Sequence, residues 1–198
     1  MPRVSDEHLA ARRRQIVEAA RRCFLREGFH RTTMQDVIAE AGLSVGAVYR
    51  YFPSKASLIN AIAEEAIGGA ELVLADLARQ DPPLPLAEAL ERTLAYVETQ
   101  TGDDGLLRLA IQVWGEAQRD PALAEFAATT YSGIRRQFEV LVRRAQQDGE
   151  ISADADPQAV AAALFGLVPG WFLQRILTGG PDRASYLAGV RALLGRSG

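Results

Sequence analysis

Hydrophobic positions recur along most of the chain at the spacing of an amphipathic α-helix. From Ile16 to Phe24 they follow at intervals of three and four residues, which predicts the buried face of a helix that runs from about residue 5 to Glu27. Alternating runs of apolar and polar residues bounded by turn signals, which would mark strands, do not occur in the chain. The pattern therefore predicts an all-α protein of about nine helices.

Proline, glycine and capping residues indicate where the other helices begin and end. Asp120 and Asp156 each precede a proline, which is the order of an N-cap followed by proline at the first helical position. Pro169 predicts a kink, and the adjacent Gly68 and Gly69 predict a kink or a close-packing point. Helices are predicted over residues 54–78, 86–100, 106–119, 121–147, 157–177 and 183–194, and Thr101–Gly105 is predicted to be a loop.

The segment from Thr32 to Lys55 predicts two short helices joined by a tight turn. Either threonine at its start can cap the first helix, and Gly42 suits the left-handed conformation that ends it. Ser44 can cap the second helix, which Pro53 stops. Two helices joined by a short turn that contains glycine form a helix-turn-helix.

The outer face of the second helix has a composition suited to DNA. Val48 and Phe52 are four residues apart and are expected to point into a small core. The remaining positions carry no carboxylate, and Gly46 would permit close approach by another surface. Their hydroxyl and cationic groups can bind phosphate, and their small apolar groups can contact thymine methyls. The residues predicted to bind DNA are Thr33, Ser44, Val45, Gly46, Ala47, Tyr49, Arg50, Tyr51 and Lys55. The residues alone leave a plain corner of two packed helices as the alternative.

The distribution of charge supports the DNA-binding interpretation, although the formal net charge is −3. Residues 1–60 contain ten Lys and Arg against six Asp and Glu, a net charge of +4, so the rest of the chain carries −7. Such an asymmetry suggests a head that faces phosphate on an acidic body. The predicted division is a DNA-binding domain over residues 1–55 and a larger helical domain over residues 56–198.

This pattern resembles the signature of the tetracycline-repressor (TetR) family of bacterial regulators. The matching residues are Thr32, Thr33, Val37, Ile38, Ala41, Gly42, Leu43, Ser44, Gly46, Ala47, Val48, Tyr49, Tyr51, Phe52, Ser54 and Lys55. Tyr51 departs from the histidine of many members, although a tyrosine still reaches phosphate. The resemblance implies a three-helix head on a ligand-sensing and dimerisation body. The body, from Trp114 to Trp171, loosely resembles choline-responsive BetI-like members, which implies a fold but no ligand.

Aromatic side chains in the body can line a small-molecule pocket, because ligand sites in helical bundles are apolar with a few polar groups. The residues predicted to bind a ligand are Trp114, Gln118, Phe138, Phe165, Trp171 and Arg175. For any single aromatic residue, membership of the hydrophobic core is the alternative.

The last two helices are apolar on more than one side, which indicates burial on both sides. Trp171 and Phe172 are adjacent and must point in different directions, so one is expected to pack in its own subunit and the other against a partner. The residues predicted to form a dimer interface are Leu164, Leu167, Val168, Phe172, Val190 and Leu194. In the TetR family these helices form a four-helix interface. A core helix wrapped by its own subunit is the alternative.

Candidate catalytic chemistry is sparse. The chain has one cysteine, two histidines and no hydrolase, zinc-protease or phosphate-loop motif, so no cofactor or metal is expected. A signal peptide and an apolar run of about 18 residues are not expected either, which favours a cytoplasmic protein without a membrane partner. The sequence predicts a homodimeric regulator, a repressor released from a palindromic operator by a small molecule. The alternatives are a regulator without a ligand, and a helical enzyme or binding protein whose hairpin is only structural.

Overall fold

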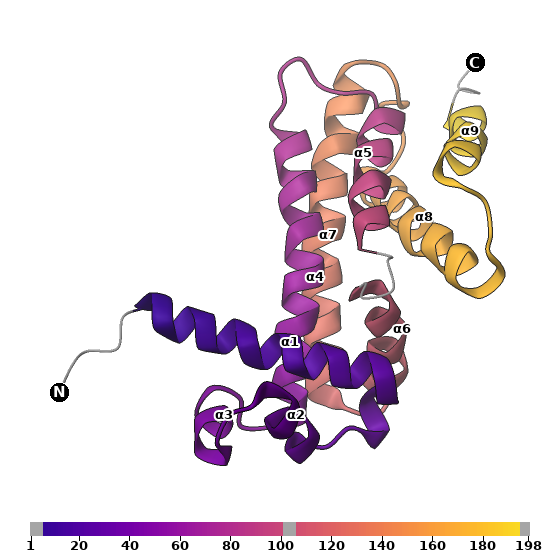
Figure 1. The fold of residues 1–198 in the computed structure, drawn as a ribbon. Helices are drawn as coiled ribbons and strands as arrows, with labels where there is room; N and C mark the ends of the chain where they lie inside the picture. Colours follow the sequence, from indigo (N-terminus) through magenta and orange to yellow (C-terminus); the bar gives the residue numbers. More distant parts are fainter. Residues whose placement is uncertain (1–5, 101–105, 195–198) are drawn as a thin grey trace. The chain divides into compact units, whose positions relative to one another are not determined.

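The computed structural model describes residues 6–100 and 106–194, and in these ranges the chain forms nine helices and no strand (Figure 1). The predicted all-α class is confirmed. The predicted loop Thr101–Gly105 lies outside the described residues. The helices are α1 (Asp6–Arg31), α2 (Met34–Ala41), α3 (Val45–Tyr51), α4 (Lys55–Ala78), α5 (Leu86–Thr99), α6 (Leu106–Ala117), α7 (Pro121–Gln147), α8 (Pro157–Thr178) and α9 (Arg183–Leu194).

Most helix ends follow from capping residues in the sequence. The side chains of Asp120 and Asp156 accept hydrogen bonds from the amides of Ala122 (2.9 Å) and Gln158 (3.0 Å). These bonds satisfy amides that have no partner within a helix. At Gly28 the backbone leaves helical geometry, with φ 79° and ψ 165°, and a further turn continues to Arg31.

The chain divides into two compact units. The first consists of the described residues up to Glu65 together with Arg108–Phe126, and the second consists of the other described residues. The first unit contains α1 to α3, the beginning of α4, most of α6 and the beginning of α7. The boundary predicted between residues 55 and 56 falls at the start of α4, inside the first unit.

The core of the first unit forms where α1 packs against α2. The apolar face predicted for α1 is fully buried, and its members are Ile16, Ala19, Ala20, Cys23 and Phe24. Phe24 also meets Phe29 edge to face, with ring centroids 4.8 Å apart. Burial raises the pKa of the Cys23 thiol, which keeps it protonated and inert.

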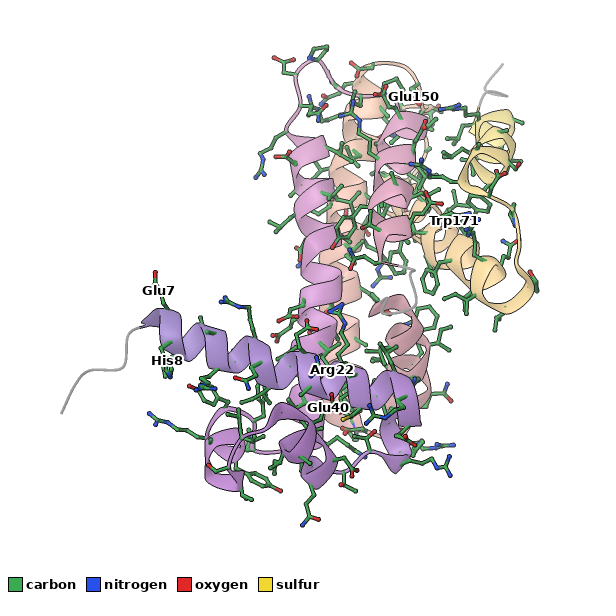
Figure 2. All side chains as sticks on the ribbon, viewed as in Figure 1. Glu7, His8, Arg22, Glu40, Glu150 and Trp171 are labelled. Carbon is green, nitrogen blue, oxygen red and sulfur yellow. The ribbon has the colours of Figure 1, made fainter. Side chains whose placement is uncertain are left out.

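The core of the second unit is built from α4, α5, α7 and α8. Its buried members are Leu74, Leu77, Leu86, Ala89, Ile134, Phe138, Leu141, Val142, Ala145, Ala161 and Leu164. A Cβ at Gly69 would lie 1.7 Å from the Tyr96 hydroxyl, so a larger residue at position 69 of α4 would displace the Tyr96 ring of α5. Both carboxylate oxygens of Glu150 accept from the Leu86 amide, at 2.9 and 3.0 Å, and cap α5 (Figure 2).

The end of the chain folds back, so that α8 and α9 both pack against α5. Trp171 donates from Nε1 to the carbonyl of Pro181 at 3.2 Å, and the Tyr186 hydroxyl donates to the carbonyl of Leu167 at 2.8 Å. Trp171 and Phe172 are 0% and 3% exposed. The prediction that the chain could bury only one of them is therefore wrong, because a single chain buries both side chains.

α8 also differs from the expectation that no apolar run approaches the length of a membrane span. Over 22 residues its one charged side chain is Arg175. Among the described residues it is the one helix that is long and apolar enough to cross a membrane, judged by length and composition alone. Core helices of globular proteins pass the same test.

Candidate nucleic-acid interface

The α2–turn–α3 hairpin is held by caps at three of its ends. Thr33 Oγ1 accepts from the Asp36 amide at 3.2 Å, and the Thr33 amide donates to the Asp36 carboxylate at 2.7 Å, which is a capping box. The hydrogen bonds that the Thr33 amide and hydroxyl donate to this carboxylate lower the pKa of Asp36. Gly42 ends α2 with φ 64° and ψ 31°, and Ser44 Oγ accepts from the Ala47 amide at 3.3 Å to begin α3. The predicted helix-turn-helix is confirmed.

The two sides of α3 differ in exposure. Val48 is fully buried and Phe52 nearly so, as the four-residue spacing predicted. Val45 and Tyr49 point the other way, and 59% and 44% of their surfaces are exposed. Among the described residues of the first unit, these two are the large apolar side chains that are exposed. Two exposed apolar side chains four residues apart on one short helix favour a surface that contacts a partner.

Gly46 lies on the same outer side of α3. A Cβ built at this position meets no atom within 4 Å, so packing inside the chain does not require glycine. Glycine instead costs the helix about 0.5–1 kcal/mol relative to alanine. With no acidic residue on α3, the face around Gly46 is open and free of negative charge.

Ion pairs between α1 and α2 hold the hairpin in place. Arg22 Nε donates to Glu40 Oε1 at 2.7 Å, and Arg26 lies 3.5 Å from the other oxygen of the same carboxylate (Figure 2). The Arg22 hydrogen bond lowers the pKa of Glu40. Gln15 of α1 adds a hydrogen bond to the carbonyl of Ala41 at the end of α2 (2.8 Å). These contacts attach α2 to α1.

Lys55 has a structural role that the sequence analysis missed. Its ammonium group donates to the carbonyls of Phe29 (2.6 Å) and Thr32 (3.2 Å), which follow the break at Gly28. The signal was present, because a helix that ends at a glycine leaves carbonyl groups without partners. An ammonium has three N–H groups, so one remains for a phosphate.

α6 supplies a further set of contacts within the first unit. Gln112 Oε1 accepts from the Phe29 amide at 3.0 Å, and Glu116 Oε2 lies 3.1 Å from His30 Nε2. Both contacts lie just after the break in α1 at Gly28. No feature of the sequence relates residues 29 and 112, so this connection could not have been predicted from it.

The similarity of this chain to known proteins agrees with the geometry. Residues 16–62, which include the hairpin, match the family of bacterial regulatory proteins described as the tetR family. Residues 85–197, more than half of the chain, match the C-terminal region of BetI-type transcriptional repressors. The chain belongs to the TetR family. Members of this family are DNA-binding transcriptional regulators, and so is this protein.

Individual relatives are similar to this protein over nearly its whole length. The HTH-type transcriptional regulator UidR of Escherichia coli K12 is 28% identical over 188 residues, which cover 92% of this chain and 91% of UidR. The structure of Salmonella enterica GusR is 26% identical with a TM-score of 0.75 and covers 98% of this chain and 97% of its own. A putative regulator from Saccharomonospora viridis in complex with choline is 25% identical with a TM-score of 0.73, covering 95% and 97%.

The six residues predicted to bind a ligand in this TetR-family regulator belong to both units. Trp114, half-buried, and Gln118, exposed, lie in the first unit. The other four lie in the second unit, where Phe138 and Trp171 are buried core residues. Arg175 lies over the Trp171 ring, 5.7 Å from its centroid. Phe165 lies 5.3 Å from the Tyr131 ring. A role in ligand binding stays a prediction for all six.

The residues predicted for the dimer interface also pack largely within their own chain. Leu164, Phe172 and Val190 are buried, and the partly buried ones are Leu167, Val168 and Leu194. Contact of these six with a partner stays a prediction. The exposed large apolar side chains of α8 and α9 are Leu177 and Leu193, at 70% and 76% exposure, and the sequence analysis did not single them out.

Proposed function

We propose that this TetR-family regulator is a homodimeric repressor whose α3 helices bind the two halves of a palindromic operator and leave it when a small molecule binds. The observation that carries the proposal is the outer face of α3, where exposed Val45 and Tyr49 flank a glycine with open space around it. Ser44, Arg50 and Tyr51 add donors for phosphate, and Ala47 adds a small apolar group. Thr33 and the free N–H of Lys55 complete the proposed contact set.

The homodimer is supported by the exposed side of α8 and α9. In addition to Leu177 on α8 and Leu193 on α9, α8 exposes Ala162, Ala163 and Gly166, whose small size allows another helix to approach closely. A two-fold dimer would place two copies of α3 on a two-fold operator. The same face could enter a lipid bilayer, but Trp171 and Tyr186 already join α8 to α9 in a packed hairpin. We therefore propose a second copy of the chain, and no membrane, as the partner.

Ligand responsiveness is supported by the relatives. One structure of similar fold and 25% identity contains choline, and the BetI-type match covers most of the second unit of this chain. A ligand acts by binding one conformation better than another. The contacts of Gln112 and Glu116 with the end of α1 offer α6 a direct way to shift the position of α2 and α3. We further propose a cytoplasmic location, where genomic DNA is accessible, and no enzymatic activity.

The DNA-binding proposal is tested by a gel-shift titration with duplexes from the region upstream of the protein's own gene. Gly46→Leu should abolish the specific shift, because a large side chain on α3 would block approach to the groove, and should leave folding intact, since a Cβ there meets nothing. Gly115→Leu is the matched control, because Gly115 is also exposed and open but lies on α6.

Three outcomes of this titration count against the proposal. Normal DNA binding by Gly46→Leu, or an equal loss in Gly115→Leu, would remove the outer face of α3 as the DNA-binding surface. Unfolding of the Gly46 variant in circular dichroism would show that glycine is required for packing, and the close-approach argument would fail. A chemical screen for release of the bound duplex, choline included, then separates a ligand-responsive repressor from a regulator without a ligand.

A further inference from the structure

The side chains of α3 offer little hydrogen bonding for the recognition of bases. Arg, Lys, Asn and Gln identify purines by paired hydrogen bonds, and Asp and Glu accept from cytosine. Among the seven residues of α3, VGAVYRY, Arg50 is the one member of these types. Its side chain lines a groove between α3 and the beginning of α1, whose lining also includes His8, Arg12 and Tyr51. Arg50 therefore lies on the flank of α3 that faces α1.

Two further polar residues beside α3 already have partners. Ser44 Oγ accepts from an amide in the first turn of α3 at 3.3 Å, and the ammonium group of Lys55 donates to two backbone carbonyls. The O–H and the N–H that remain to them suit a phosphate oxygen. The outer side of α3 is left with Val45, Gly46 and Tyr49, none of which lines the groove.

Val45 and Gly46 lie in the first turn of α3, and exposed Tyr49 follows one turn later. In a helix-turn-helix the first residues of the second helix contact base edges in the major groove. A Cβ at Gly46 would meet no atom within 4 Å, so the space beside Val45 is open to a base edge. The helical rise places Val45 and Tyr49 about 6 Å apart along the axis of α3, which corresponds to about two base-pair steps of DNA.

Thymine is the base that offers an apolar group to such a face. Its C5 methyl group points into the major groove, whereas the other base edges there present donors and acceptors. A donor or acceptor that meets valine loses its hydrogen bond to water without gaining another, which costs binding free energy. A methyl group that meets valine buries apolar surface of both molecules. The face therefore favours thymine over the other bases.

We propose that the regulator recognises its operator through thymine methyl groups, with Val45 as the main contact and the ring of Tyr49 as the second. The inference deepens the proposed function and rests on it, because it requires the outer side of α3 to enter the major groove. It assigns the selection of bases to Val45, whereas phosphate contacts carry no sequence information. Each half-site should then contain one or two contacted thymines within about two base-pair steps.

The DNA side of the proposal is tested by removing one methyl group at a time. In the upstream duplex that the wild type shifts, each thymine of the footprint is replaced by deoxyuridine, which lacks that methyl group alone, and binding is followed by fluorescence anisotropy. One or two positions in each half-site should weaken binding about fourfold, the contribution of one buried carbon. At those positions 5-methylcytosine paired with guanine should bind nearly as well as thymine, and unmethylated cytosine should not.

Val45→Ala tests the protein side. It should weaken binding to the thymine duplex about fourfold or more and abolish the effect of deoxyuridine at the contacted positions, because the partner of the methyl group is gone. Its salt slope should match that of the wild type, since no phosphate contact is lost. Val140→Ala is the matched control, because Val140 is an exposed valine on α7. It should keep both the affinity and the deoxyuridine effect, and Tyr49→Phe, which retains the ring, should keep the deoxyuridine effect as well.

Equal binding of deoxyuridine and thymine duplexes at every position would overturn the inference. A deoxyuridine effect that persists in full in Val45→Ala would overturn the assignment to Val45. If Gly46→Leu abolishes binding while deoxyuridine has no effect, this inference fails and the proposed function stands. If Gly46→Leu binds normally, the proposed function itself fails.

Discussion

α3 and α8 both carry apolar residues on more than one side, but the chain covers them to different extents. On α3 the chain buries Val48 and leaves Val45 and Tyr49 in solvent. On α8 it buries the adjacent Trp171 and Phe172 together, although they point in different directions. The outer side of α3 therefore requires a partner to explain it, and most of the apolar surface of α8 does not.

The difference follows from what determines the surroundings of each helix. α3 is seven residues long, with a side-chain cap at its start and a buried residue, Phe52, at its end, so its buried side is fixed by residues close in sequence. The 22 residues of α8 are covered by whichever elements fold against it, and here these include α5, α7 and α9. Apolar residues around the whole circumference of a long helix therefore predict burial, but they do not predict by which chain.

The largest expected effect concerns the apolar residues of the second unit that its own helices leave exposed. The double variant Leu177→Glu and Leu193→Glu should convert the protein to monomers in light scattering, because it places four charges in the proposed interface. Without fixed spacing between two α3 helices, specific DNA affinity should fall about a thousandfold, toward the non-specific level.

Leu72→Glu is the control for this variant, because Leu72 is equally exposed, at 70%, but lies on α4. It should remain a dimer with full affinity for DNA. A double variant that stays dimeric would move the interface elsewhere, and a monomeric wild type with specific binding would remove the homodimer from the proposal.

The comparison itself is tested by truncating one aromatic residue on each helix. Trp171→Ala should lower the free energy of unfolding by about 3–5 kcal/mol, because it leaves a cavity and removes the hydrogen bond to Pro181. Tyr49→Ala should change it by about 0.5 kcal/mol or less, since Tyr49 is exposed, but should weaken DNA binding. Urea denaturation and anisotropy on the same samples measure both effects. A Tyr49 variant as unstable as the Trp171 variant would contradict the comparison.

The sequence predicted the fold where the decisive contacts are local. The capping box of Thr33, the left-handed Gly42 and the cap at Ser44 were all visible, since each involves residues within a few positions of each other. The prolines after Asp120 and Asp156 located two more helix starts for the same reason. Dense local signals also carried the family resemblance, so the DNA-binding class could be predicted from about a quarter of the chain.

The candidate site was less predictable where distant segments meet. The sequence suggests that Lys55 is an unpaired cation beside α3, but in the structure its ammonium group donates to carbonyls more than 20 residues earlier. His8 and Arg12 share a groove with α3 only because α1 crosses it in the folded unit. Periodicity shows which side of a helix is apolar, but it does not show which element will lie against that side.

The smallest expected effect concerns the local cap that orients the hairpin. The pKa of Asp36 is lowered from its ordinary value of 3.8, mainly by the hydrogen bond from the Thr33 amide. A carboxylate with a depressed folded-state pKa stabilises the fold above its unfolded pKa, and this contribution is lost as the pH falls through the folded value. Asp36→Asn should therefore melt at a slightly lower temperature than the wild type at pH 7.

The pH dependence of this difference in melting temperature shows whether the negative charge of Asp36, and not only its hydrogen-bond geometry, stabilises the hairpin. The gap in melting temperature between wild type and Asp36→Asn, followed by circular dichroism, should shrink as the pH falls below about 4, because the wild-type carboxylate then becomes neutral as well. Thr33→Ala should reduce the gap without abolishing it, since the amide of residue 33 still donates to Asp36 after the hydroxyl is lost. If the difference in melting temperature stays constant from pH 7 to pH 3, the charge of Asp36 does not contribute to the stability of the hairpin. The hairpin would then be held by hydrogen-bond geometry, by packing and by the Arg22–Glu40 pair.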